Sequence, residues 1–257
     1  MPYKTLLVDD RDGVVTVTLN RPEVHNAFNA ELIAEAIELF DGLAHSSARA
    51  VVLRGSGANF CAGADLHWMS RMVSYSRDEN VRDSAKLAKM YAVINECPLP
   101  IVGRIQGAAI GGGVGLVAVC DIAVCAREAK FGLSEVKLGI LPAVISPYVI
   151  AKIGETHARA LFLTGERFDA ERALRIGLVH RVADDLDAAV DETIAQLRTS
   201  GPEAVRECKK LIAHVAASEL AEAVPYTIET IAARRVSSEG QSGMSAFLKK
   251  EKPPWAK

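Results

Sequence analysis

The sequence lacks a charge excess of either sign. It contains 30 Lys and Arg residues against 32 Asp and Glu residues, with a formal net charge of −2. Proteins that bind nucleic acids usually carry a basic patch or stripe, whereas the basic residues here are scattered, apart from Lys249, Lys250 and Lys252. The composition therefore argues against a nucleic-acid partner.

The cysteines lack any pairing pattern. The five are Cys61, Cys97, Cys120, Cys125 and Cys208, and their spacing matches neither a CxxC pair nor a zinc site. An odd number in a chain of this length indicates reduced thiols and a cytosolic setting. We therefore expect a cytoplasmic protein that has no metal centre and uses its cysteines as small core residues.

A long uninterrupted hydrophobic run is also missing. The first residues, MPYKTLLVDD, contain no apolar core of signal-peptide length. The most apolar stretch, residues 105–124, includes several glycines and Asp121, which makes it a poor membrane span. The sequence thus predicts no association with a membrane.

Strand and helix patterns alternate through the first half of the chain. GVVTVTL (13–19) and RAVVLRG (49–55) are typical of strands, and Asn29 is placed to cap a helix over residues 30–44. The polar stretch 70–84 is expected to be mobile. After residue 145 the pattern becomes helical. We predict an α/β core over residues 1–195, followed by a C-terminal helical region over residues 196–257 that serves self-association.

Three consecutive glycines stand where a helix should begin, in GAAIGGGVGLVAVCDIAV (107–124). Each glycine costs about 1 kcal/mol in a helix relative to alanine, so bare backbone must serve a purpose there. The free N–H groups of a helix start suit a phosphate or a developing oxyanion. The Lys-Ser/Thr pair of a P-loop is absent. Close packing of the helix against its neighbours is an equally good explanation of the glycines alone.

A second loop of small residues, FCAGADL (60–66), also follows a predicted buried strand. Two such strand-to-helix turns could each give one N–H group to a shared oxygen atom. Each donor of this kind contributes about 3 kcal/mol in a transition state. The pair favours the oxyanion interpretation.

Four motifs occur in a recognisable order and spacing: AGADL (62–66), GGGVGL (111–116), CDIAVCA (120–126) and FGLSEVKLGILP (131–142). In these motifs, over nearly its whole length, the chain resembles the enoyl-CoA hydratase/isomerase, or crotonase, family. The resemblance implies a spiral of ββα units with a C-terminal helical trimerisation region. It also implies an acyl-CoA substrate that brings its own coenzyme A, no further cofactor, and a homotrimer or a dimer of trimers.

The resemblance also assigns roles to residues. It implies an oxyanion hole built from the backbone N–H groups of Ala62 and Gly112, with Glu135 of FGLSE as the catalytic acid/base. Without the family, Glu135 would be interpreted as a first-turn helix residue behind a Ser134 cap. The substrate-binding residues would be Ala62, Gly63, Ala64, Asp65, Leu66, Gly111, Gly112 and Lys250. Asp65 is also expected to fix its own turn, and Lys250 is equally well explained as part of a solvated basic tail.

One position departs from the family pattern. Gly115 stands where hydratases with two glutamates have the first of them. The chain could be a hydratase in which another group orients the water, an isomerase with Glu135 as sole acid/base, or a protein that binds acyl-CoA or RNA without catalysis. The balanced charge argues against RNA. The segment LPAVISPYV resembles bacterial methylglutaconyl-CoA hydratases of leucine degradation, which favours hydration of a branched 2-enoyl-CoA.

Overall fold

The computed structural model describes residues 3–256 and contains two β-sheets. The larger has the strand order β1-β2-β3-β4-β6-β9, and the smaller has the order β5-β7-β8. β1 runs antiparallel to β2 and β8 to β7, and the other neighbours are parallel. The strands are β1 (Leu6–Arg11), β2 (Val14–Leu19), β3 (Ala50–Gly55), β4 (Ile101–Ile105), β5 (Ala108–Ile110), β6 (Ile122–Ala126), β7 (Lys130–Gly132), β8 (Arg167–Asp169) and β9 (Arg181–Ala183).

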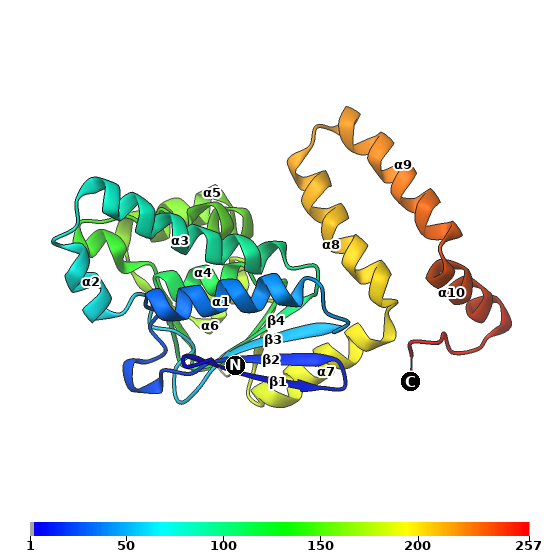
Figure 1. Cartoon of the computed structure of the whole chain (residues 1–257), viewed down its shortest axis with the longest axis horizontal. Coiled ribbons are helices and arrows are strands. Elements are labelled where there is room, and N and C mark those ends of the chain that lie inside the picture. Colours follow the sequence, from blue (N-terminus) through cyan, green and yellow to red (C-terminus); the bar gives the residue numbers. More distant parts are fainter. Residues whose placement is uncertain (1–2, 257) are drawn as a thin grey trace.

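Helices cover both faces of the larger sheet (Figure 1). α1 and α3 pack together on one side, and α7 contacts β4, β6 and β9 on the other. The parallel strands therefore lie between two hydrophobic clusters, as crossover connections require. The helices are α1 (Ala30–Leu43), α2 (Leu66–Met72), α3 (Arg77–Glu96), α4 (Gly112–Ala118), α5 (Ser146–Thr164), α6 (Ala170–Arg175), α7 (Leu186–Thr199), α8 (Pro202–Ala217), α9 (Leu220–Val236) and α10 (Ser238–Lys249), with short 3₁₀ turns η1 (Pro22–Val24) and η2 (Ser134–Leu138).

The predicted α/β architecture is confirmed, and two local predictions need correction. Strand β1 was missed, although Asp12 and Gly13, both with positive φ, form the tight turn typical of a hairpin. Much of the polar stretch 70–84 is helical. Ser76 and Glu79 form a capping box, so that α3 begins at Arg77, inside this stretch.

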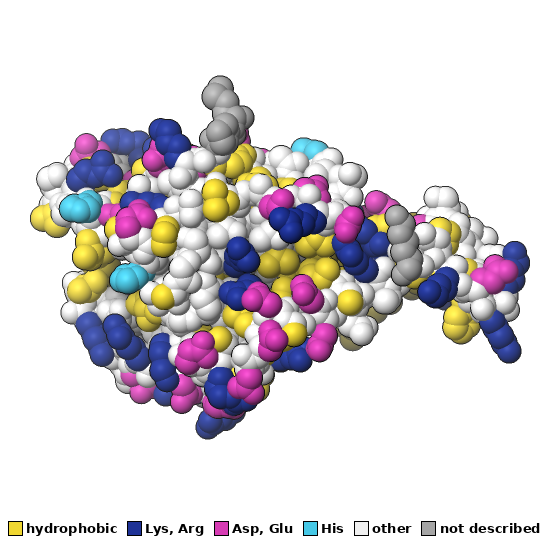
Figure 2. All heavy atoms as spheres, turned by 90° about the horizontal axis from the view of Figure 1, so that it is seen from below, with side chains coloured by type: hydrophobic (Ala, Val, Ile, Leu, Met, Phe, Trp, Pro, Cys, Tyr) yellow, Lys and Arg dark blue, Asp and Glu magenta, His cyan; other side chains and the backbone are white. Residues whose placement is uncertain are grey.

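The last three helices form an arm that projects away from the core (Figure 1). The boundary expected at residues 195 and 196 falls inside α7, which packs on the sheet. The next helix, α8, begins at Pro202, and its Arg206 and Lys209 still bind core residues. On the face seen in Figure 2, basic and acidic side chains are interspersed over core and arm. None of the helices within residues 3–256 combines the length and hydrophobicity that crossing a bilayer requires.

Candidate active site

Short backbone pairing brings the two small-residue loops together. The Cys61 N–H donates to the Ala108 carbonyl, and the Ile110 N–H donates to the Cys61 carbonyl, both over 3.0 Å. The start of the first loop therefore runs beside β5, directly ahead of the three glycines. Gly63 faces the second turn so closely that a methyl group on it would lie 3.5 Å from the Gly112 nitrogen.

The Ala62 N–H is not free, which corrects the donor assignment made from the motif. It donates to the carbonyl oxygen of His25 over 3.0 Å. The situation differs at Ala64, two residues after Ala62. There the Phe28 N–H donates to the Gly63 carbonyl, and the Asp65 N–H donates to the Phe28 carbonyl. This one-sided pairing turns the Ala64 N–H away from Phe28, and no acceptor binds it within residues 3–256.

The Gly112 N–H is the second free donor. Gly112 is the first residue of α4, so its N–H has no partner inside the helix, and no other acceptor binds it in the described part of the chain. Gly111, the N-cap, has a φ of 53°, a conformation that glycine adopts without strain. Ala64 and Gly112 thus present one unpaired N–H each, on two turns that touch.

Close packing also explains the glycines. A Cβ on Gly112 would collide with the Phe28 ring, and one on Gly113 would collide with the Cys61 carbonyl. For the three glycines alone, the sequence left close packing and oxyanion binding as equal explanations. The structure shows that the two are compatible. The glycines permit the contacts that hold the turn, and the turn presents its N–H groups.

Glu135 lies against the glycine turn. A methyl group on Gly111 would sit 2.9 Å from its Oε1 atom. Its Oε2 atom is buried and has no hydrogen-bond partner among the described residues. Burial raises the pKa of the Glu135 carboxyl above its ordinary value. Ser134 provides no side-chain cap, since the N-cap of the 3₁₀ turn η2 is Leu133 without a capping bond. The expected Ser134 cap is therefore wrong, although Glu135 does lie in the first turn of η2.

Apolar atoms occupy the place of the missing glutamate. A Cβ on Gly115 would collide with the Ile145 side chain and lie 3.0 Å from the Tyr91 ring. Both residues are buried, Tyr91 completely. The site therefore has one carboxylate, and the space beside Gly115 is closed to a second.

Asp65 holds the first turn, as the sequence predicted, with a partner that the sequence did not reveal. It caps α2 by accepting from the N–H groups of His67 and Trp68, at 2.7 and 3.2 Å, and it pairs with Arg21 at 2.7 Å. Burial alone would raise the pKa of Asp65, but these bonds outweigh it and the pKa is lowered. Leu66, the next residue, is 80 % exposed.

Lys250 does not join the site within one chain. It ends α10 in a left-handed conformation, with a φ of 60°. Figure 1 shows α10 at the opposite end of the molecule from α2, which begins at the AGADL turn. Within this single chain, the helix that precedes Lys250 therefore lies far from the AGADL turn.

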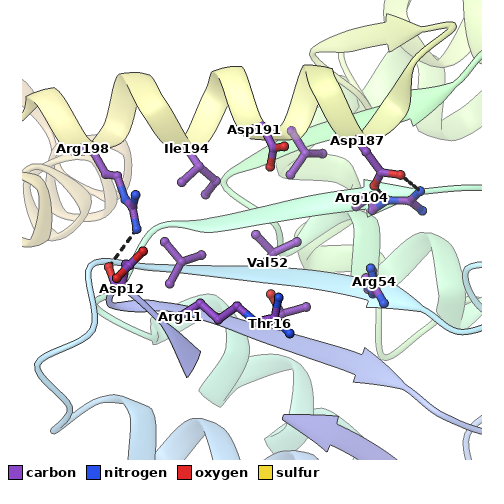
Figure 3. Close-up of a pocket in the computed structure, with 12 residues that line it drawn as sticks. Arg11, Asp12, Thr16, Val52, Arg54, Arg104, Asp187, Asp191, Ile194 and Arg198 are labelled. Atoms are coloured by element: carbon purple, nitrogen blue, oxygen red, sulfur yellow. Dashed lines mark hydrogen bonds and ion pairs between the residues drawn. The ribbon is translucent and has the colours of Figure 1, made fainter. Parts of the chain in front are cut away.

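A hollow of about 270 Å³ lies elsewhere, between α7 and the strands β1 to β4 (Figure 3). Arg104 pairs with Asp187 there, and Arg198 donates to the Asp12 carbonyl. These bonds attach α7 to the sheet, and the hollow contains none of the predicted site residues. Among residues 3–256 no cluster of His, Cys, Asp or Glu is placed to hold a metal ion.

Comparisons with known proteins agree with this fold. The family model "Enoyl-CoA hydratase/isomerase" matches residues 9–257. The crystal structure of an enoyl-CoA hydratase from Shewanella pealeana superimposes with a TM-score of 0.95 at 38% identity, covering 98% of this chain and 96% of that one. AtuE from Pseudomonas aeruginosa superimposes with a TM-score of 0.96 at 37% identity, covering 99% and 100%.

One curated relative has a different activity in its name. The mitochondrial Delta(3,5)-Delta(2,4)-dienoyl-CoA isomerase of Dictyostelium discoideum is 31% identical over 98% of this chain and 91% of its own length. Hydratases and isomerases thus occur among the relatives of a single fold. The site combines two glycine- and alanine-rich turns, free N–H groups and a buried glutamate. Because the family model also matches nearly the whole chain, the chain belongs to the enoyl-CoA hydratase/isomerase family.

Proposed function

We propose that the protein adds water across the double bond of a 2-enoyl-CoA thioester, with a branched, methylglutaconyl-like acyl chain as its substrate class. By homology the chain is an enzyme of the enoyl-CoA hydratase (lyase) class. The observation that supports the mechanism best is Glu135, a buried carboxylate with an unpartnered oxygen against a turn that presents free N–H groups. The LPAVISPYV segment supports the branched substrate.

The reaction would use three groups of this chain. The Ala64 and Gly112 N–H groups bind the thioester oxygen. The Glu135 carboxylate takes a proton from a water molecule while the water oxygen bonds to C3, and the double-bond electrons move onto the thioester oxygen as an enolate. Neutral Glu135 then returns the proton to C2. One carboxylate thus serves both proton transfers, and the added atoms are those of one water molecule.

The space filled beside Gly115 favours a second candidate, an enoyl-CoA isomerase. Isomerisation needs only removal of a proton at one carbon and its return at another, which one carboxylate can perform. Ile145 and Tyr91 leave no room for a second group to hold water on that side. The isomerase in the name of the Dictyostelium relative adds support to this alternative.

The mass of the product distinguishes the two reactions. The protein is incubated with a panel of 2-enoyl- and 3-enoyl-CoA esters, including methylglutaconyl-CoA. A product heavier by one water supports the hydratase, whereas an unchanged mass with a moved double bond establishes the isomerase and overturns hydration.

Glu135→Gln should lower kcat by about a thousandfold in either case, the size of a lost acid/base contribution. Glu128→Gln, which changes an exposed glutamate, is the matched control and should have no effect. Unchanged turnover in Glu135→Gln would remove Glu135 from the mechanism.

We also propose that the active form is a homotrimer or a dimer of trimers in the cytoplasm. The arm exposes Leu220, Val236 and Phe247, each more than three-quarters accessible, which favours self-association. The distance between the helix that precedes Lys250 and the AGADL turn within one chain fits a lysine that reaches the coenzyme A of a neighbouring subunit. Sedimentation of the intact protein tests the assembly.

A further inference from the structure

Tyr91, which no sequence motif indicated, contacts the glycine turn from within the core. It lies on α3 and is completely buried. Its hydroxyl donates a 2.7 Å hydrogen bond to the Gly112 carbonyl oxygen. A methyl group on Gly112 would lie 2.8 Å from the same hydroxyl oxygen. A buried phenol thus binds the residue that presents the second free N–H.

Phe28 closes the space beside Gly112 together with Tyr91, since one added Cβ would meet both side chains. A Cβ on Gly112 would also collide with the edge of the Phe28 ring, and the backbone of Phe28 holds the first turn through Gly63 and Asp65. Gly112 therefore lies against an aromatic ring and a phenol hydroxyl. Glycine has the softest backbone of any residue, so these outside contacts help to fix the direction of its peptide groups. They add to the hydrogen bonds that the Gly111 carbonyl accepts from the Val114 and Gly115 N–H groups.

We propose that Tyr91 is a positioning residue of the oxyanion hole: its hydroxyl fixes the Gly112 carbonyl and thereby aims the Gly112 N–H at the thioester oxygen. The proposal rests on the proposed function, since it needs an acyl thioester bound at this turn. Donors stabilise a developing charge only when they are aimed before the reaction begins, and a small misplacement reduces the rate steeply.

The surroundings keep Tyr91 in this role. Burial, followed by the nearby Cys61 and Glu135, raises the pKa of Tyr91 well above its ordinary value, so the hydroxyl keeps the proton that it donates. The ring edge also lies against Gly115, where a Cβ would be 3.0 Å away. The side chain that orients Gly112 is thus one of the two that exclude a second carboxylate.

Tyr91→Phe tests the proposal because it removes the hydroxyl and keeps the buried ring. Tyr148→Phe is the matched control: its ring packs 6.0 Å from that of Tyr91, and its hydroxyl forms no hydrogen bond within the described residues. We expect kcat of Tyr91→Phe to fall ten- to roughly a hundredfold with KM changed less than about twofold, and Tyr148→Phe to resemble the parent enzyme. Equal losses in the two variants would indicate packing alone and overturn the proposal.

A second readout does not depend on turnover. Acetoacetyl-CoA carries an acidic C2 position, and its enolate has a strong near-ultraviolet absorption band. An aimed oxyanion hole should increase this band on binding, and Tyr91→Phe should reduce the increase. If kcat and the band both stay at parental levels, the role of Tyr91 is refuted and the hydratase proposal stands. If the parent turns over no ester but only Tyr91→Phe loses the band, the hydratase proposal fails and the positioning role stands.

Discussion

The two turns of the site differ in what holds them. The first, residues 61–66, is fixed by polar groups: Asp65 binds Arg21 and two backbone N–H groups, and Phe28 bonds to the backbone on either side of Ala64. Within this turn only Gly63 has a positive φ, 91°, which glycine adopts without strain. This turn depends on charge and hydrogen bonds.

The second turn, residues 111–115, is fixed by close contact, in addition to the backbone hydrogen bond from the Gly111 N–H to the Gly132 carbonyl. Gly112, Gly113 and Gly115 each face an atom too close to admit a methyl group, and Tyr91 gives the one side-chain hydrogen bond found there within residues 3–256. The difference teaches that the same chemical task, presenting one N–H, is achieved by different forces. A lost charge should disrupt the first turn, and an added methyl should disrupt the second.

The largest expected effect is that of Gly113→Ala. The new methyl would overlap the Cys61 carbonyl, a backbone atom that cannot move without breaking the pairing of the two loops. We expect the free energy of unfolding to fall by about 3–5 kcal/mol, measured by denaturant titration, with activity lost.

Gly42→Ala is its control. Gly42 lies in α1 with nothing within 4 Å of an added methyl, so the same substitution should stabilise the protein by roughly 0.5–1 kcal/mol. If both substitutions had the same small effect, the second turn would not be held by contact.

Asp65→Ala should have the next largest effect. It removes a helix cap and leaves the largely buried Arg21 without its partner, which we expect to cost about 3 kcal/mol. Because the pKa of Asp65 is lowered in the folded state, this stabilisation is present above the unfolded pKa of about 3.9 and is lost as pH falls through the folded value.

Asp65→Asn separates the two contributions, since asparagine caps helices as well as aspartate but carries no charge. Asp184→Asn, which changes an exposed pair with Arg127, should cost much less than Asp65→Asn. Equal costs for Asp65→Asn and Asp184→Asn would show that the Arg21 pair does not hold the first turn.

The smallest effect concerns the stability of Glu135→Gln. A carboxyl with a raised pKa penalises the folded state as pH rises from its unfolded value to its folded value. The substitution should therefore raise the Tm at about pH 8, and the gain should vanish below about pH 4, where the carboxyl is neutral in both states. A gain that did not vary with pH would show that burial of the charge at Glu135 is not its cause.

Local signals predicted much of the fold. Asn29 caps α1 as its spacing indicated. Such features depend on residues close together in the chain, which is why sequence alone revealed them. The short strands β7 and β8 were missed because three-residue strands carry almost no periodicity of their own.

The sequence by itself determined the family, the single carboxylate at Glu135 and the two turns that meet beside it, because motifs, order and spacing are written along the chain. Only the tertiary structure decided which N–H groups are free. The Ala62 N–H donates to the His25 carbonyl, whereas Phe28 bonds only to the neighbours of Ala64 and leaves the Ala64 N–H without an acceptor in the described part of the chain. The tertiary structure also placed the side chains of Tyr91 and Ile145 against Gly115, where they fill the space that a side chain would need. A hydrogen bond or a contact between distant segments depends on where the folded backbone carries them, and no local pattern encodes that position.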